Sequence, residues 1–130
     1  MHGSGFKAPG ASATSKQAGD AAEDAALLHL QRAGLRLVKR NYRTPGRGGG
    51  EIDLVMLDKD GTTVFVEVRS RTGVDHGGAA ASISARKRQR IVFAARHYLM
   101  QLRSIPPCRF DGVVRDHGTI EWLRGAFDAT

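Results

Sequence analysis

The sequence has one cysteine, few aromatic residues and no long apolar run. Because Cys108 is alone among 130 residues, neither an intramolecular disulfide nor a cysteine-rich metal site can form. No apolar stretch approaches the roughly 20 residues that a membrane-spanning helix needs, and the N-terminal segment lacks the apolar core of a secretory signal. Aromatic residues make up only 6%, and no strand is rich in them, which argues against stacking of single-stranded nucleic acid. These absences predict a soluble, cytoplasmic protein that does not enter a membrane.

The length of 130 residues suits one domain with a single modest core. Residues 1–17 are rich in Gly, Ala and Ser, which predicts a flexible N-terminal tail. The folded domain is expected to span residues 18–128.

Positive charge is concentrated in two blocks. The formal net charge is +7. Residues 35–50 hold five cations and residues 82–103 hold six, and neither block contains an acid. Such blocks favour a polyanionic partner, with nucleic acid ahead of an anionic membrane surface. A surface charge that only maintains solubility is the alternative.

Apolar spacing and turn residues predict an α/β domain with a mixed sheet and helices packed on it. The first helix is expected from about Ala18 to Ala33, and the second from an N-cap at Ser82 or Ser84 to about Arg103. Strands are expected at residues 35–43, 51–58, 62–71, 109–116 and 119–124. The resulting order is α-β-β-β-α-β-β.

One acid lies on the apolar stripe of the first helix. Helical spacing puts Glu23 on the same face as Ala26, Leu27 and Leu30, which should pack on the sheet. A carboxylate in that place costs several kcal/mol unless it meets a cation, hydrogen-bond donors or a metal ion. A structural salt bridge is the alternative to a functional role.

Two more acids lie in the predicted hairpin. A three-residue loop at residues 59–61, with Gly61 in the left-handed conformation, would place Val55 opposite Phe65 and Asp53 opposite Glu67. Alternation predicts that Glu51, Asp53, Val55 and Leu57 share one face of their strand, and that Ile52, Leu54 and Met56 share the other. Like charges directly opposite repel, so either Arg69 or a bridging divalent cation must neutralise them.

A magnesium or manganese ion is one answer to this repulsion. Mg²⁺ prefers oxygen ligands and is usually held by a few carboxylates, with water and substrate phosphate completing the shell. Asp53, Glu67 and the main-chain carbonyl of Val68 could supply such a set, with Glu23 or Glu51 at its margin. Bound in this way, the ion would activate water and neutralise charge on a phosphodiester.

Four blocks of sequence occur in an order that resembles a known family. "GEIDLV", "FVEVRSR", "RKRQRI" and "WLRGAF" are similar to the YraN family of small bacterial proteins, which in turn resembles PD-(D/E)xK nucleases of the Holliday-junction-resolvase type. The resemblance implies a restriction-endonuclease-like fold for residues 18–128. It also implies a metal-dependent endonuclease acting on structured or branched DNA in recombination or repair. The resemblance is also compatible with a homodimer.

The resemblance assigns roles to individual residues. Glu23 matches the acid of the first helix, Asp53 the metal-binding aspartate and Glu67 the second acid, whereas Arg69 stands where the superfamily has lysine. A lysine can orient or deprotonate the attacking water, but an arginine keeps its proton and can only stabilise charge. A protein that binds nucleic acid without cutting it, or a partner within a recombination complex, is therefore the alternative function.

Lys87 is a candidate substitute for the missing lysine. It shares a helical stripe with Ile83, Ile91, Ala94 and Tyr98, so it could reach the acids, or it could extend to solvent instead. Five arginines in the two basic blocks are expected to contact nucleic-acid phosphates: Arg43, Arg47, Arg86, Arg88 and Arg90. For Arg43 and Arg47, simple solvation of a loop is the alternative.

Overall fold

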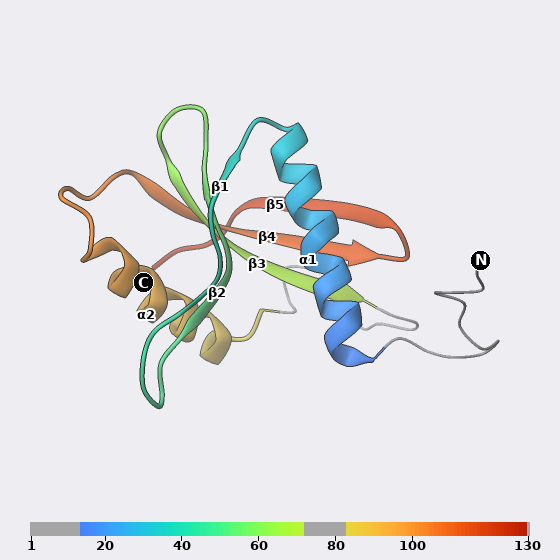
Figure 1. Ribbon diagram of the computed structural model, residues 1–130, viewed down its shortest axis with the longest axis horizontal. Helices are drawn as coiled ribbons and strands as arrows, with labels where there is room; N and C mark the ends of the chain where they lie inside the picture. The colour runs from blue at the N-terminus through green and yellow to red at the C-terminus, as the bar shows by residue number, and fades with distance from the viewer. Residues whose placement is uncertain (1–13, 72–82, 130) are drawn as a thin grey trace, which may run out of the picture.

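The computed structural model describes residues 14–71 and 83–129, and these form two helices and a five-stranded mixed sheet (Figure 1). The elements are α1 (Ser15–Arg32), β1 (Arg36–Arg43), β2 (Glu51–Leu57), β3 (Thr63–Arg71), α2 (Ala85–Leu99), β4 (Cys108–Asp116) and β5 (Thr119–Phe127). The predicted α/β class and the order α-β-β-β-α-β-β are confirmed. The tail predicted for residues 1–17 lies largely outside the described residues, as does the predicted cap at Ser82.

The strands lie in the order β1-β2-β3-β4-β5, and only the β3–β4 pair is parallel. A parallel pair needs a crossover connection, and the segment containing α2 supplies it. Each helix covers one face of the sheet. One core layer joins Leu30 of α1 to Val66 and Val113, and the other joins Ile91 of α2 to Phe65 and Phe110.

The helix ends differ from their predicted positions by a few residues. α1 starts at Ser15 because Thr14 and Gln17 form a capping box, a signal that lies before the apolar stripe begins. α2 starts after Ser84, whose side chain accepts the N–H of Lys87. It ends at Leu99 rather than near Arg103: Met100 is exposed, and the N–H groups of Gln101 and Leu102 donate to carbonyls three residues back in a tighter turn. Neither helix is long and apolar enough to cross a membrane, within the ranges that the structure describes.

The predicted hairpin loop is confirmed. The N–H of Asp58 donates to the carbonyl of Thr62, and Gly61 has a φ of 91°. This geometry closes a three-residue loop and sets the register in which Val55 lies opposite Phe65, as predicted.

The sheet splits between β2 and β3 at its end opposite to this loop. The β2–β3 pairing stops at Leu54 and Val66. Beyond that pair, β2 stays bonded to β1 as far as Glu51, and β3 stays bonded to β4 as far as Arg71. In Figure 1, β2 runs down toward the loop of residues 44–50, whereas β3 runs to the right. We call the wedge between them the sheet fork.

Regular alternation fails beside the fork. Ile52 packs in the same core layer as Val55, although it was predicted to share a face with Leu54 and Met56, so that prediction is wrong. A matching irregularity lies on the neighbouring strand. Asn41, which the β1–β2 register puts across from Asp53, has a φ of 55°. Asparagine tolerates this left-handed conformation better than most residues, and the reversal turns the following side chains to the other face.

Candidate functional site

The centre of the candidate site is a pair of carboxyl groups in the sheet fork. Continuing the β2–β3 register by one residue puts Asp53 across from Glu67, and each side chain acts on the pKa of the other. In an unbroken sheet the N–H of Val68 would face Ile52 of β2. Instead, it donates to Asp53 Oδ2 at 2.7 Å, so a carboxylate replaces the missing strand partner. The predicted juxtaposition of the two acids is confirmed.

Both acids hold their protons more tightly than free side chains. Burial, and then the negative charge of Asp53, raise the pKa of Glu67 from 4.5 to about 8. Burial also raises the pKa of Asp53, against the opposing effects of the Val68 N–H, the Glu67 side chain and Lys87. Only 3% of Glu67 is exposed, so the pair has little water to stabilise two negative charges. A nearby cation would therefore stabilise the ionised form of the pair.

Two cations act on this pair. Lys87, in the first turn of α2, places its Nζ 3.5 Å from Glu67 Oε2, so it reaches the acids rather than extending away to solvent. Arg69 lies two residues after Glu67 on β3, and its charge lowers the pKa of Glu67. The lysine comes from a helix, whereas the arginine occupies the strand position expected for lysine.

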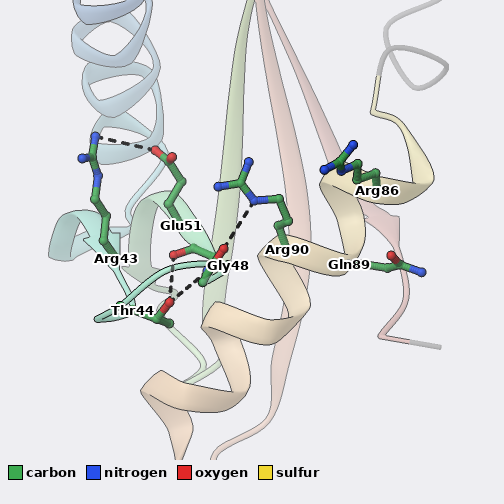
Figure 2. A pocket seen from close by; sticks show the side chains of 10 residues that line it. Arg43, Thr44, Gly48, Glu51, Arg86, Gln89 and Arg90 are labelled. Atoms are coloured by element: carbon green, nitrogen blue, oxygen red, sulfur yellow. Dashed lines mark hydrogen bonds and ion pairs between the residues drawn. The ribbon is translucent and has the colours of Figure 1, made fainter.

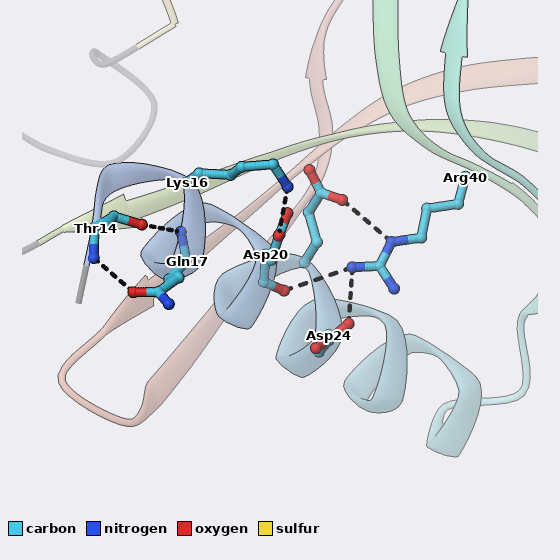
Figure 3. Close-up of polar contacts among 7 residues, drawn as sticks. Thr14, Lys16, Gln17, Asp20, Asp24 and Arg40 are labelled. Carbon is cyan, nitrogen blue, oxygen red and sulfur yellow. Dashed lines mark hydrogen bonds and ion pairs between the residues drawn. The ribbon is translucent and has the colours of Figure 1, made fainter. Parts of the chain in front are cut away.

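Glu23 approaches the pair from the α1 face, where it is tied to β1. Its Oε1 lies 3.2 Å from Nε of Arg40, and Nη2 of Arg40 lies 2.7 Å from Oδ1 of Asp24 (Figure 3). Burial and the charge of Asp53 raise the pKa of Glu23, while Arg40 opposes both effects. The salt-bridge alternative for Glu23 is therefore realised, and the same carboxylate remains close enough to Asp53 to feel its charge.

A cavity of about 490 Å³ opens beside the fork, between the 44–50 loop and α2 (Figure 2). We call it the loop cavity. Arg43 and Glu51 line it from the strands, at 4.0 Å from each other, and Arg86 and Arg90 line it from α2. Since Glu51 also acts on the pKa of Asp53, the cavity adjoins the acid pair.

The base of the 44–50 loop is clamped to α2. A Cβ atom on Gly50 would lie 1.9 Å from the main-chain oxygen of Arg90, and one on Gly49 would lie 2.0 Å from Thr44 Oγ1. Only glycine permits this approach. Thr44 accepts the N–H of Gly50 on its hydroxyl, and Arg90 Nε donates to the carbonyl of Gly49 at 3.4 Å. The loop and the helix therefore form one wall.

The structure brings together three of the five predicted phosphate-binding arginines. Arg43, Arg86 and Arg90 line the loop cavity, whereas Arg88 lines a separate cavity with Phe93 on another side of α2. Arg47 is exposed on the 44–50 loop and is not part of the cavity lining.

Two residues that the sequence interpretation did not single out have strong interactions. Arg40 holds Glu23, and no spacing pattern in the polar strand β1 points to it. Asp111 is fully buried and accepts hydrogen bonds from Arg109, Trp122 and the N–H of Gly125. An acid within the apolar run "RFDGVV" is the same signal that led to Glu67, and it could have identified Asp111.

The fork offers a suitable donor set for a divalent cation. Within residues 14–71 and 83–129, no group of three or more His, Cys, Asp or Glu side chains is arranged to hold a metal ion. Mg²⁺ often uses only one or two carboxylates. A strand residue points its N–H and C=O to the same side, so the Val68 carbonyl faces the fork as its N–H does. Asp53, Glu67 and this carbonyl thus fit a hard divalent cation.

These features define a class of protein. It is an α/β domain whose sheet splits around two carboxyl groups, with a lysine supplied by the following helix. Residues 22–114 match the family model described as "Uncharacterised protein family UPF0102". The chain therefore belongs to the UPF0102 family, which confirms the resemblance to the YraN family.

Its relatives match along most of their length. A UPF0102 protein of Albidiferax ferrireducens is 72% identical over 116 residues, which cover 89% of this chain and 91% of the relative. A UPF0102 protein of Paracidovorax citrulli is 66% identical and covers 89% of this chain and 86% of its own. A third, from Polaromonas sp., is 60% identical over 135 residues, with 97% and 91% covered.

Proposed function

We propose that this protein is a metal-dependent nuclease that hydrolyses phosphodiester bonds in structured or branched DNA, with a role in recombination or repair. The observation that carries the proposal is the pairing of buried Glu67 with half-buried Asp53 in the sheet fork, with Lys87 Nζ 3.5 Å from Glu67 Oε2. Buried acids at such short range need a cation, and a metal that receives a phosphate oxygen satisfies both this need and the chemistry of hydrolysis.

Asp53, Glu67 and the carbonyl of Val68 would hold Mg²⁺ or Mn²⁺. Such an ion supplies activation of water and neutralisation of negative charge at phosphorus. The remaining groups belong to the chain. Lys87 can orient the attacking water beside Glu67, while Arg69 keeps its proton and stabilises charge on the phosphate. The ammonium that the superfamily carries on a strand would thus come from α2.

Glu23 would act from the margin of the site as an orienting residue. Its tie to Arg40 fixes the side chain and offsets part of its repulsion from Asp53. Arg43, Arg86 and Arg90 in the loop cavity would contact backbone phosphates next to the reacting one. Glu51 lines this cavity and lies two residues from Asp53, about 7 Å along an extended strand. This distance is close to the separation of neighbouring phosphates along a DNA strand, so one phosphate could lie at the cavity while the next lies at the acids. Contacts between arginines and phosphates position DNA without reading its sequence.

The proposal is tested by cleavage of a four-way junction and a linear duplex with Mg²⁺, with Mn²⁺ and with a chelator. Asp53→Asn and Glu67→Gln are expected to reduce the rate by roughly a hundredfold or more, the usual loss when a main electrostatic stabiliser is removed. Lys87→Met should lower kcat while leaving DNA affinity nearly unchanged. Glu121→Gln, the same change of charge at an exposed position of β5, is the matched control.

Two outcomes would contradict the proposal. Cleavage that persists in both acid variants would show that the fork is not the active site. DNA binding without cleavage in either metal would instead favour the alternative of a nucleic-acid-binding protein on a nuclease-like fold, in which Arg69 and Lys87 only neutralise the acids.

A further inference from the structure

A second basic cavity lies at the other prong of the sheet fork. It has a volume of about 500 Å³, and Gln17 of α1, Ser70 and Arg71 of β3, and Arg115 and His117 of the β4–β5 hairpin contribute polar walls. We call it the hairpin cavity. None of these residues takes part in the acid pair.

The fork relates the two cavities to each other. The prong formed by β1 and β2 ends at Glu51, which lines the loop cavity. The prong formed by β3 and β4 ends at Arg71 and Asp116, beside the hairpin cavity. Asp53 and Glu67 lie where the prongs meet. A basic cavity therefore stands on each side of the acids, along two strands that diverge from them.

The walls of the hairpin cavity are held in place. His117 and Gly118 have φ values of 50° and 92°, the pattern of a tight two-residue turn whose twist matches the strands it joins. Arg115 pairs with Ser70 in the parallel ladder. On the helix side, the capping box fixes Gln17, whose Oε1 accepts the N–H of Thr14 at 2.8 Å. Because these residues are already held in place, they lose little conformational entropy when an anion binds.

The charge of the hairpin cavity favours an anion. Arg71, Arg115 and His117 contribute basic groups, and no Asp or Glu is among the described residues that line the cavity. Asp116, next to it in the hairpin, lies 3.6 Å from His117 through its Oδ1. Ala18 and Ala21 of α1 line the rest of the cavity, and a phosphodiester bound there would meet guanidinium groups that suit its oxygens.

We propose that the hairpin cavity is a second phosphate-binding site, which holds the nucleic-acid backbone on the side of the acid pair opposite to the loop cavity. This inference rests on the proposed nucleic-acid substrate. The DNA would cross the mouth of the fork, with phosphates held at both prongs and the reacting phosphate at the junction between them. A substrate long enough to reach both cavities would bind more tightly than one that reaches only the loop cavity.

The test compares charge reversal at the two cavities, with DNA affinity measured by fluorescence anisotropy across a range of salt concentrations. Arg115→Glu is expected to lower the salt slope by at least about one and to weaken binding at least about eightfold at 0.1 M salt, since loss of one contact changes log K by about 0.9 per decade of salt and the new carboxylate repels phosphate. Arg90→Glu should do the same at the loop cavity, and the two effects should multiply. Arg36→Glu is the matched control, because Arg36 pairs with Leu57 at the far end of the sheet.

A length series of the DNA adds a second readout. Shortening the DNA until it reaches a single cavity should abolish the effect of Arg115→Glu while that of Arg90→Glu persists. Arg115→Gln and thermal unfolding of each variant separate a lost contact from a damaged fold.

The inference is overturned if Arg115→Glu weakens binding no more than Arg36→Glu while Arg90→Glu weakens it strongly. In that case the proposed function still stands. A wild-type protein that neither binds nor cleaves any of the DNAs would instead overturn the proposed function, and this inference with it.

Discussion

Replacing Glu67 by glutamine should change how the stability of the metal-free protein depends on pH. Glutamine has nearly the shape of a protonated glutamic acid and keeps a hydrogen-bond donor, but it cannot ionise. The variant thus fixes the fork in the state that the wild-type protein adopts below the raised pKa of Glu67.

The sign and size follow from that pKa. In the unfolded chain Glu67 loses its proton near 4.5, whereas in the folded protein it does so near 8. Below pH 4.5 both states are protonated, and Glu67 contributes no pH dependence. Between these values only the folded state keeps the proton, so the free energy of unfolding falls by up to about 1.4 kcal/mol per pH unit. Above pH 8 the full cost is present, on the order of 5 kcal/mol.

Urea unfolding between pH 4.5 and 9, with a chelator present, measures this effect. The wild-type protein should lose stability as the pH rises, and Glu67→Gln should lose much less, so that it is the more stable of the two at pH 9. Glu121→Gln should follow the wild type, because its exposed carboxylate has no comparable burial. Taking the difference between curves removes the contribution of all other titrating groups.

Parallel pH curves for the wild type and Glu67→Gln would refute the reasoning. They would mean that Glu67 ionises in the folded protein as it does in the unfolded chain. The fork would then hold two charged acids without strain, and the electrostatic argument for a bound cation would lose its basis.

Three other changes have expected outcomes. Mg²⁺ at a hundredfold excess over its Kd should raise the free energy of unfolding by about 2.7 kcal/mol at pH 8, and calorimetry should detect little binding to Asp53→Asn. Gly50→Ala should destabilise the protein by roughly 2–4 kcal/mol in urea, because the new methyl group would meet the backbone of α2. Asp111→Ala should cost roughly 3–5 kcal/mol, because it leaves Arg109 and Trp122 without their buried acceptor, and Asp111→Asn should cost less.

Local rules were sufficient for most of the fold. Each helix and strand follows from apolar spacing and turn residues, and Gly61 alone was enough to choose the hairpin register. That register put Asp53 and Glu67 together, since the residue opposite a given position in a hairpin is set by the count from the turn. The acid pair was thus predictable because both members lie within one hairpin.

The surroundings of the pair were less predictable because they depend on contacts between distant segments. Arg40 of β1 contacts Glu23 of α1, and nothing in the spacing of β1 indicates this contact. The reversal at Asn41 was also outside what alternation could predict. Alternation assumes an extended backbone at every residue, and one left-handed residue breaks that assumption for Ile52 on the neighbouring strand as well. Length and composition carry no information on either contact.

The position of Lys87 connects the loop cavity to the acid pair. Lys87 belongs to the first turn of α2, and the next turn is held against the 44–50 loop by the close approach of Gly50 to Arg90. A change that pushes the loop away from the helix must also shift the ammonium that lies 3.5 Å from Glu67. Gly50, the last glycine in "RGGGE", therefore serves more than loop flexibility: it sets the distance between α2 and the strand that carries Asp53. An arginine at position 69 becomes compatible with this site once a lysine arrives from the helix, and the close packing at Gly50 is what brings that lysine within reach.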